Sequence, residues 1–415
     1  MPSLPTADTD VIVVGAGLAG LSAAVRLQEA GCNVRVFEAD DDVGGRVRTD
    51  VLDGFLLDRG FQLLNPAYPA VRALIDRRAL RPHRFWRVLR VVDAGRIRLL
   101  GNPFDSPRGV TGLQPPSPVG FRDLAALAAL SLRDAAAPAR FLTGAADQTT
   151  ERELRRWGLS ERFIDAVLRP FLTGVLAEAD LDTSARFFHL VWRSFLRAAP
   201  VLPADGMGAL SHQLANRLAA GTVTLNARVE DAGPGEVRVA GRRHTTRAVV
   251  VATDATAAAD LLPTLPIPAW KGLHTFYYRA PEAPLPEPVI TVDSRRGPVV
   301  NTTIPSNVSS TYAPTEQALI SATTLLNADH ADTRDAVTAH LAELYRTSTA
   351  NWDLVGHYPI PHALPRMTAP HRLRTPTRVE PGLYVCGDHR DTSSIQGALA
   401  SGARAARAVS ADLAS

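Results

Sequence analysis

The first clear pattern in the chain is an apolar run that changes its period at a cluster of glycines. Residues 11–14 are four consecutive aliphatic side chains, as in a strand that is buried on both faces. From 18 to 30 the apolar positions follow helical spacing, and Gly31 provides a stop signal. Residues 33–37 are again strand-like and end at Glu38. The pattern therefore predicts a βαβ unit of about 30 residues.

The rest of the chain alternates between helical and strand-like stretches. Further helices are expected at 68–78, 121–142, 151–157, 161–172, 185–198, 210–218 and 334–345, and from 395 to the end. Further strands are expected at 87–92, 97–100, 223–229, 248–252, 273–278, 289–292, 319–323 and 382–386, with two short strand-like pieces between 52 and 64. Residues 357–365 contain three prolines and are expected to lack regular structure.

Composition narrows the class of protein. With 415 residues, 46% of them hydrophobic, the chain can bury a large core and is expected to form two domains. The net charge of +3 comes without a basic cluster, so no nucleic-acid partner is expected. Two cysteines, Cys32 and Cys386, provide neither a disulfide framework nor a metal site. No apolar run is long enough to cross a bilayer and no signal segment is visible, so a cytoplasmic location is expected.

The glycines at the first strand–helix turn predict a dinucleotide site. Gly15 allows the tight turn, Gly17 lets a diphosphate approach the backbone, and Gly20 lets helix and strand pack closely. Glu38 lies about 20 residues further on, where a carboxylate can hold a ribose hydroxyl and disfavours a 2′-phosphate. The expected diphosphate loop is Gly15, Ala16, Gly17, Leu18, Ala19 and Gly20.

The residues that follow Glu38 point to one dinucleotide. The run from Glu38 to Thr49 reads E-A-x(4)-G-G-R-V-R-T. It resembles the FAD fingerprint of the superfamily of flavin amine oxidases, phytoene desaturases and protoporphyrinogen oxidases. The resemblance implies that Ala39, Gly44, Gly45 and Arg46 help to hold the cofactor, with the arginine reaching the diphosphate. It favours FAD over NAD, and non-covalent FAD, because neither cysteine stands where the family forms its cysteinyl link.

The same resemblance extends to later segments and to the fold. It implies a segment under the flavin ring and a G-M-G element at 206–208 that returns the chain to the FAD domain. It also implies a C-terminal signature, G-D followed by a helix whose N-terminus faces the pyrimidine end of the flavin. The cofactor contacts implied in these segments are Gly60, Phe61, Gln62, Val229, Gly387, Asp388, Ile395, Gln396 and Ala398. Asp58 and Arg59 are either further contacts or a salt bridge in a hairpin.

The implied architecture is α/β. A Rossmann-like FAD-binding domain of the GR2 type carries an inserted α+β substrate-binding domain. We expect the FAD-binding domain to comprise residues 1–78, 200–265 and 375–415, and the substrate domain to comprise residues 79–199 and 266–374.

The resemblance also implies the class of reaction. The leading hypothesis is an FAD-dependent oxidoreductase that removes a hydride at C–C or C–N of an apolar or cyclic small molecule and passes electrons to oxygen, a quinone or another acceptor. One alternative is an amine oxidase with Lys271, the only lysine of the chain, near flavin N5; a solvated surface lysine is the favoured interpretation of this residue. A redox-neutral flavin-dependent isomerase and a flavin-free binding protein of the GDP-dissociation-inhibitor type are further alternatives.

Overall fold

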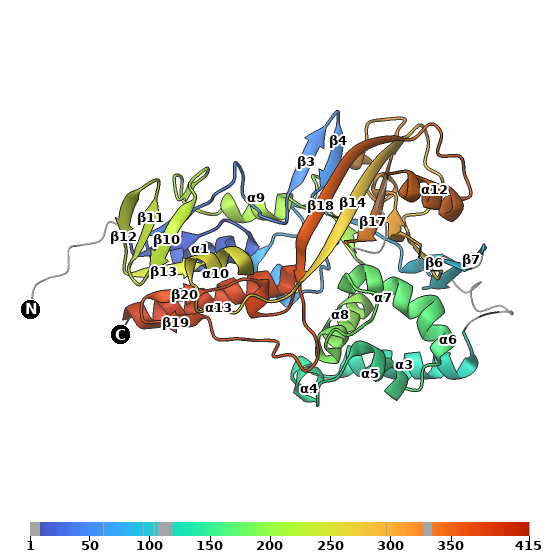
Figure 1. Ribbon diagram of the computed structural model, residues 1–415, viewed down its shortest axis with the longest axis horizontal. Helices are drawn as coiled ribbons and strands as arrows, with labels where there is room; N and C mark the ends of the chain where they lie inside the picture. Colours follow the sequence, from blue (N-terminus) through green and yellow to red (C-terminus); the bar gives the residue numbers. More distant parts are fainter. Residues whose placement is uncertain are drawn as a thin grey trace, which may run out of the picture.

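The computed structural model describes residues 9–60, 62–93, 95–102, 104–106, 117, 119–295, 297–326 and 334–414. The molecule is elongated, with a parallel sheet at one end and a larger, mainly antiparallel sheet with a group of helices at the other (Figure 1).

The six-stranded sheet has the order β19-β20-β13-β1-β2-β9. Its strands are β1 (Val11–Val14), β2 (Val34–Phe37), β9 (Val223–Thr224), β13 (Ala248–Val251), β19 (Arg378–Glu380) and β20 (Leu383–Val385). All neighbouring pairs are parallel except β19 with β20. The predicted βαβ unit is present, with α1 (Leu18–Glu29) between β1 and β2.

Alternate residues of β1 enter two different cores. Val11 and Val13 pack with α1, α2 (Pro69–Leu74), α9 (Ala209–Ala215) and α13 (Ile395–Ala414). Ile12 and Val14 pack with α10 (Ala255–Leu261) and a three-stranded antiparallel sheet. That sheet consists of β10 (Val229–Gly233), β11 (Glu236–Val239) and β12 (Arg242–Thr245). Because both faces are covered, the strand is aliphatic at every position.

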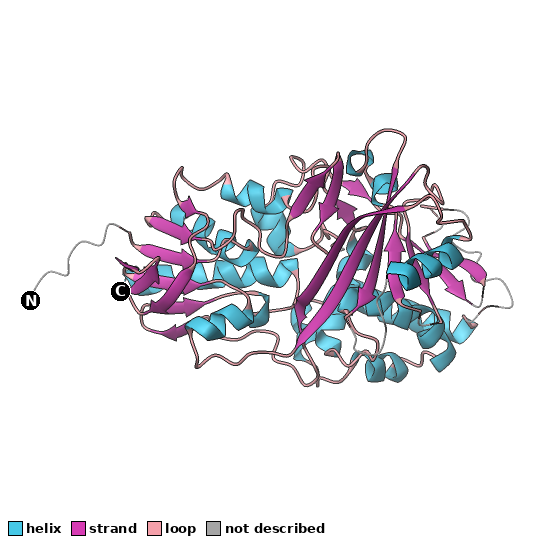
Figure 2. Cartoon of the chain, turned by 45° about the horizontal axis from the view of Figure 1, so that its top comes forward, coloured by secondary structure: helices cyan, strands magenta, loops and turns pink. Residues whose placement is uncertain are grey.

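The seven-stranded sheet has the order β18-β14-β17-β16-β15-β6-β7. Its strands are β6 (Val88–Asp93), β7 (Arg96–Gly101), β14 (Trp270–Ala280), β15 (Ile290–Asp293), β16 (Val299–Thr303), β17 (Ala318–Leu325) and β18 (Asp353–Pro365). Helix α12 (Arg334–Tyr345) covers one face. Figure 2 shows the long strands β14 and β18, which pair with each other, running between the two ends of the molecule.

A group of helices lies below this sheet in Figure 1 and has its own core. Its members are α3 (Phe121–Ala136), α4 (Ala139–Gly144), α5 (Thr150–Arg156), α6 (Glu161–Phe163), α7 (Arg169–Leu176) and α8 (Ala185–Arg197). The remaining elements are the hairpin β3 (Thr49–Leu52) and β4 (Phe55–Asp58), the pair β5 (His83–Arg84) and β8 (Val201–Leu202), and the short helix α11 (Pro305–Val308).

Four expectations about secondary structure are wrong. The strand expected at 223–229 is divided, because β9 ends at Thr224 and Val229 begins β10 in another sheet. The proline-containing stretch 357–365 belongs to strand β18. This strand is at the edge of its sheet, where a residue without an N–H group is tolerated. The helix expected at 121–142 is divided between α3 and α4 next to Pro138, and a π-helical turn interrupts the helix expected at 161–172.

Candidate functional site

A cavity of about 790 Å³ lies between the parallel sheet and the seven-stranded sheet, with walls formed by both. It begins at the glycine turn after β1. Gly15 has a φ of +99°, which an L side chain rarely adopts, and a Cβ at Gly20 would lie 1.9 Å from the Gly15 carbonyl oxygen. A Cβ at Gly17 would meet no described protein atom closer than 4.0 Å, because this residue faces the cavity. The three glycines thus occupy the positions that a dinucleotide turn requires.

The carboxylate at the end of β2 lies beside this turn. Glu38 is 7% exposed, and its Oε2 accepts a hydrogen bond from the Ala16 N–H at 2.5 Å, while Oε1 accepts one from the Asp40 N–H at 2.9 Å. Glu38 and Ala39 both line the cavity, as do Gly15, Gly17, Leu18 and Ala19. Ala16 and Gly20, also expected as contacts, are not among the described lining residues because their place is in the packing behind the turn.

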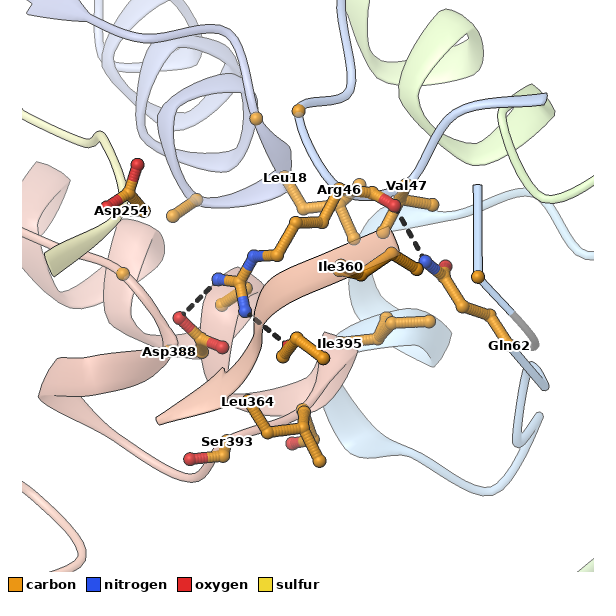
Figure 3. A pocket seen from close by; sticks show the side chains of 18 of the residues that line it. Leu18, Arg46, Val47, Gln62, Asp254, Ile360, Leu364, Asp388, Ser393 and Ile395 are labelled. Atoms are coloured by element: carbon orange, nitrogen blue, oxygen red, sulfur yellow. Dashed lines mark hydrogen bonds and ion pairs between the residues drawn. The ribbon is translucent and has the colours of Figure 1, made fainter. Parts of the chain in front are cut away.

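The second glycine pair forms the opposite side of the entrance. The Gly44 N–H donates to the Ala16 carbonyl at 2.9 Å, which joins this loop to the first turn, and Gly44, Gly45 and Arg46 all line the cavity. Arg46 extends across it to Asp388, with 2.7 Å between Nη2 and Oδ1, and also donates to the Ala363 carbonyl (Figure 3). Burial alone would lower the pKa of Arg46, but the charge of Asp388 and its hydrogen bond outweigh burial and raise it.

The segment after β4 contributes Gly60 and Gln62 to the cavity wall. Gln62 donates from Nε2 to the Arg46 carbonyl at 2.6 Å (Figure 3), while its Oε1 is buried and has no hydrogen-bond partner among the described residues. An unpaired buried acceptor on a cavity wall is suited to a ligand N–H. Phe61, the third contact expected here, lies outside the described residues.

Asp58 is buried and joins three segments of the chain through hydrogen bonds. Its carboxylate accepts hydrogen bonds from Thr49 Oγ1 at 2.5 Å, the Met207 N–H at 2.9 Å and Tyr312 OH at 3.0 Å. Burial raises the pKa of Asp58 to about 6, although these hydrogen bonds act against the increase. The alternative of an Asp58–Arg59 salt bridge is wrong, because Arg59 pairs with Asp50 across the β3–β4 hairpin at 2.9 Å. Of the two residues, Arg59 lines the cavity and Asp58 does not.

The C-terminal signature closes the cavity from the side of the parallel sheet. Gly387 and Asp388 follow β20, and α13 begins at Ile395 with its first turn against the cavity. Ile395 and Ala398 line the cavity, as does Val229 at the start of β10. Gln396 does not belong to the described lining, because its Oε1 accepts a hydrogen bond from the Ala70 N–H. The N–H groups of Gly397 and Ala398 donate to Ser394, which leaves those of Ile395 and Gln396 and the partial positive charge of the helix N-terminus at this point.

The other end of the cavity is apolar. The side chains and backbone that α7, α8 and the seven-stranded sheet contribute include no charged group among the described residues. They are Phe171, Gly174, Val175, Ala177, Phe187, Val191, Phe195, Leu273, Ile290, Val292, Asn301, Ile360, Ala363 and Leu364. Every described acidic residue of the lining, namely Glu38, Asp40, Glu230, Asp254, Asp260 and Asp388, comes from elements around the parallel sheet.

Lys271 is buried, so the favoured interpretation as a solvated surface lysine is wrong. It is 8% exposed, and its Nζ lies 2.6 Å from Glu178 Oε2, 2.9 Å from the Leu176 carbonyl and 2.7 Å from Thr183 Oγ1. Burial lowers the pKa of Lys271, and the charge of Glu178 opposes this effect. Among the described residues of β14, Leu273 lines the cavity and Lys271 does not.

Sequence reasoning missed most of the substrate-side wall. Phe171 and Val175 on α7, and Phe187, Val191 and Phe195 on α8, stand at helical spacing. Nothing in one sequence distinguishes an apolar face that lines a cavity from one that enters a core. Asp254 also lines the cavity and is the N-cap of α10, a role that suits an aspartate shortly after a buried strand.

These features fit a flavin dinucleotide. Gly17 leaves open space where a diphosphate would approach, Glu38 stands at the end of β2, and Gln62 offers an unpaired acceptor further along the cavity. The first turn of α13 presents its N–H groups at the far side. The residues present therefore match the donor and acceptor pattern that such a cofactor needs.

Comparison with curated proteins gives short, clear matches. The chain is 46% identical over 71 residues to protoporphyrinogen oxidase 2 of Arabidopsis thaliana, which is 17% of this chain and 14% of that protein. It is 44% identical over 80 residues to putrescine oxidase of Kocuria rosea, 19% of this chain and 17% of that protein. The matched stretches thus span less than a fifth of the length of these relatives.

Solved structures of similar fold match nearly end to end. A putative protoporphyrinogen oxidase from Exiguobacterium has a TM-score of 0.73 at 17% identity, covering 98% of this chain and 99% of that one. Cyclohexylamine oxidase from Brevibacterium oxydans has a TM-score of 0.73 at 18% identity, with coverage of 98% and 100%. At such identities the likeness shows the mixed α/β fold alone.

A family model described as flavin containing amine oxidoreductase matches residues 18–410, which is nearly the whole chain. The expectation of an FAD-dependent oxidoreductase is confirmed at the level of this family. The chain belongs to the flavin-containing amine oxidoreductase family.

Proposed function

We propose that the protein is an FAD-dependent dehydrogenase or oxidase that oxidises a C–C or C–N bond of a neutral, apolar or cyclic small molecule by taking a hydride from its C–H bond. The observation that carries this proposal is the uncharged, largely aromatic and aliphatic lining that α7, α8 and the seven-stranded sheet give to the cavity. A cationic substrate would lose its hydration there without meeting a carboxylate, which is costly. A neutral hydrocarbon skeleton would gain from the same surroundings.

We further propose that the chain forms two discontinuous domains, of which one binds FAD and the other binds the substrate. Residues 1–78, 200–265 and 375–415 would form a Rossmann-like FAD-binding domain of the GR2 type, and residues 79–199 and 266–374 an inserted substrate domain. The parallel sheet with its three-stranded partner, and the separate seven-stranded sheet, support this division.

The residues around the parallel sheet would hold the cofactor. Gly17 and the start of α1 would receive the diphosphate, and Glu38 the ribose hydroxyls. Asp388 would accept from the ribityl chain, and Arg46, which it already orients, would lie near the diphosphate. The bound flavin supplies the hydride acceptor, and the protein supplies orientation and electrostatics.

The chain contributes to the reaction through the helix terminus and the apolar wall. The N–H groups at the start of α13 would stabilise negative charge at the pyrimidine end of the flavin. Phe171, Phe187 and Phe195 would exclude water and press the substrate toward the flavin. Oxidation of the C–C or C–N bond also releases a proton. Because the described lining from α7, α8 and the seven-stranded sheet holds no titratable side chain, this proton would pass to solvent.

The amine-oxidase alternative has weaker support. Two relatives by fold and sequence carry the names putrescine oxidase and cyclohexylamine oxidase, which is the reason to consider it. Against it, Lys271 is engaged with Glu178 and Thr183, and Leu273 occupies the cavity side of β14. A lysine-bound water beside the flavin would need Lys271 to leave a buried ion pair.

An absorption spectrum before and after denaturation tests the proposal at its base. We expect flavin bands, and flavin that separates from the polypeptide on denaturation. Turnover that needs a stoichiometric acceptor would support net oxidation, while turnover without one would show a redox-neutral isomerase. A purified protein that neither carries nor takes up FAD would refute the proposal in favour of a binding protein.

A further inference from the structure

One side chain stands out in the apolar part of the cavity. Asn301 on β16 is the only polar side chain among the described lining residues of α7, α8 and the seven-stranded sheet. It is 5% exposed, and its amide has no hydrogen bond to another described residue. Its amide atoms are not among the fully buried polar atoms without a partner, because the residue lines the cavity. A ligand that covers the amide must therefore hydrogen-bond it or leave it unpaired, and the second outcome costs free energy.

The surroundings of Asn301 fix its position. It pairs in register with Thr323 on β17, and Thr323 pairs with Thr275 on β14, so the three polar residues form a row across the sheet. The Thr323 hydroxyl is buried and has no partner among the described residues. On the other side, a Cβ at Gly174 of α7 would lie 2.4 Å from Asn301 Nδ2. The amide is thus held between the helix backbone and the sheet.

We propose that Asn301 is the specificity-determining residue of the cavity and hydrogen-bonds a carbonyl or hydroxyl oxygen on an otherwise apolar ring substrate. The inference rests on the proposed function and names the substrate class of the same site. An amide can donate to a carbonyl, or donate to and accept from a hydroxyl. Thr323, the cross-strand neighbour of Asn301, has a buried hydroxyl without a partner among the described residues, but it does not line the cavity.

A hydrogen bond from Asn301 would both orient the substrate and select among substrates. The apolar walls hold a ring skeleton without fixing its rotation, whereas one hydrogen bond at a fixed point sets its orientation. A site built to pair a polar group also rejects analogues that lack the group, because its own amide is then left unpaired. A pure hydrocarbon is therefore the weaker ligand relative to its carbonyl counterpart.

Calorimetric titration of the FAD-loaded protein with 1-tetralone and with tetralin tests the inference, because the two compounds share a skeleton and differ in the carbonyl. We expect Asn301→Leu to lower the ratio of the two affinities by about 3- to 10-fold, the effect of one net hydrogen bond. The matched control is Val292→Ala on the neighbouring apolar wall, which should weaken both compounds and leave the ratio unchanged. Asn301→Asp keeps the shape but loses the donor, and should also lower the ratio if the leucine variant fails to fold.

An unchanged ratio in folded Asn301 variants would overturn the inference, as would a wild-type protein that binds neither compound. Calorimetry does not depend on turnover. A protein whose ratio responds to Asn301, but whose flavin no substrate reduces, would refute the proposed function and leave the binding role of Asn301 in place.

Discussion

Replacing Lys271 by methionine separates a structural from a catalytic role for this lysine. Its Nζ pairs with Glu178 at 2.6 Å, and both side chains are 7% exposed. Methionine has a similar length and is apolar, so it fills the space but leaves the Glu178 carboxylate buried without its cation. Breaking a buried ion pair from one side typically costs about 3–5 kcal/mol. For 415 residues this corresponds to a fall in Tm of roughly 3–6 °C.

The cost should depend on pH. Burial already raises the pKa of Glu178, and the charge of Lys271 acts against the increase. Removing the lysine raises this pKa further in the folded state only. When the pKa of Glu178 is higher in the folded than in the unfolded protein, the folded state becomes less stable as the pH rises and the carboxyl group loses its proton. The loss of stability caused by Lys271→Met should therefore be larger at pH 8 than at pH 5.

Thermal unfolding of four proteins provides the assay: wild type, Lys271→Met, Glu178→Gln and the double variant. In the double variant no charge is left unpaired, so it should recover most of the lost Tm. In parallel, the photoreduced proteins are exposed to air, and we expect equal rates of flavin reoxidation in wild type and Lys271→Met. A slower reoxidation with unchanged Tm would refute this reasoning and place Lys271 at the flavin.

Two further predictions concern the cofactor site and its support. The Gly17→Ala variant should have an unchanged Tm in its flavin-free form but bind FAD at least about tenfold more weakly. The Gly20→Ala variant should have a lower Tm in its flavin-free form, because its Cβ would lie 1.9 Å from a backbone oxygen. Equal effects of the two substitutions on Tm would contradict these roles. Asp58→Asn should remove a decline in wild-type stability between about pH 4 and pH 6, because the folded pKa of about 6 exceeds the unfolded value and the difference is worth on the order of 3 kcal/mol. Tm profiles of both proteins check this, and parallel profiles would exclude Asp58 as the titrating group.

The parts of the fold that repeat a strict local pattern could be predicted from the sequence. The βαβ unit around Gly15–Gly20 and the final strand and helix were found because buried parallel strands and glycine turns leave few alternatives. Strand β18 was missed because proline argues against a strand, and only the sheet order reveals that it is at an edge.

The candidate site divides in the same way. The cofactor side is encoded by residues near one another in sequence, such as Gly44, Gly45 and Arg46, so motif spacing was enough. The substrate side is assembled from α7, α8 and four strands that are distant in sequence. Neither the burial of Lys271 nor the isolation of Asn301 has a local signal, because both depend on which elements pack together.

Anaerobic reduction of the bound flavin by matched neutral and cationic compounds tests the central claim most directly. The pairs are cyclohexanone with cyclohexylamine and 1-tetralone with 1-aminotetralin, and the readout is bleaching of the flavin band. We expect at least one neutral compound to bleach the band faster than its amine counterpart, because the described residues that α7, α8 and the seven-stranded sheet contribute to the cavity wall offer no carboxylate to an ammonium group. Bleaching by the amines alone would contradict it and establish an amine oxidase.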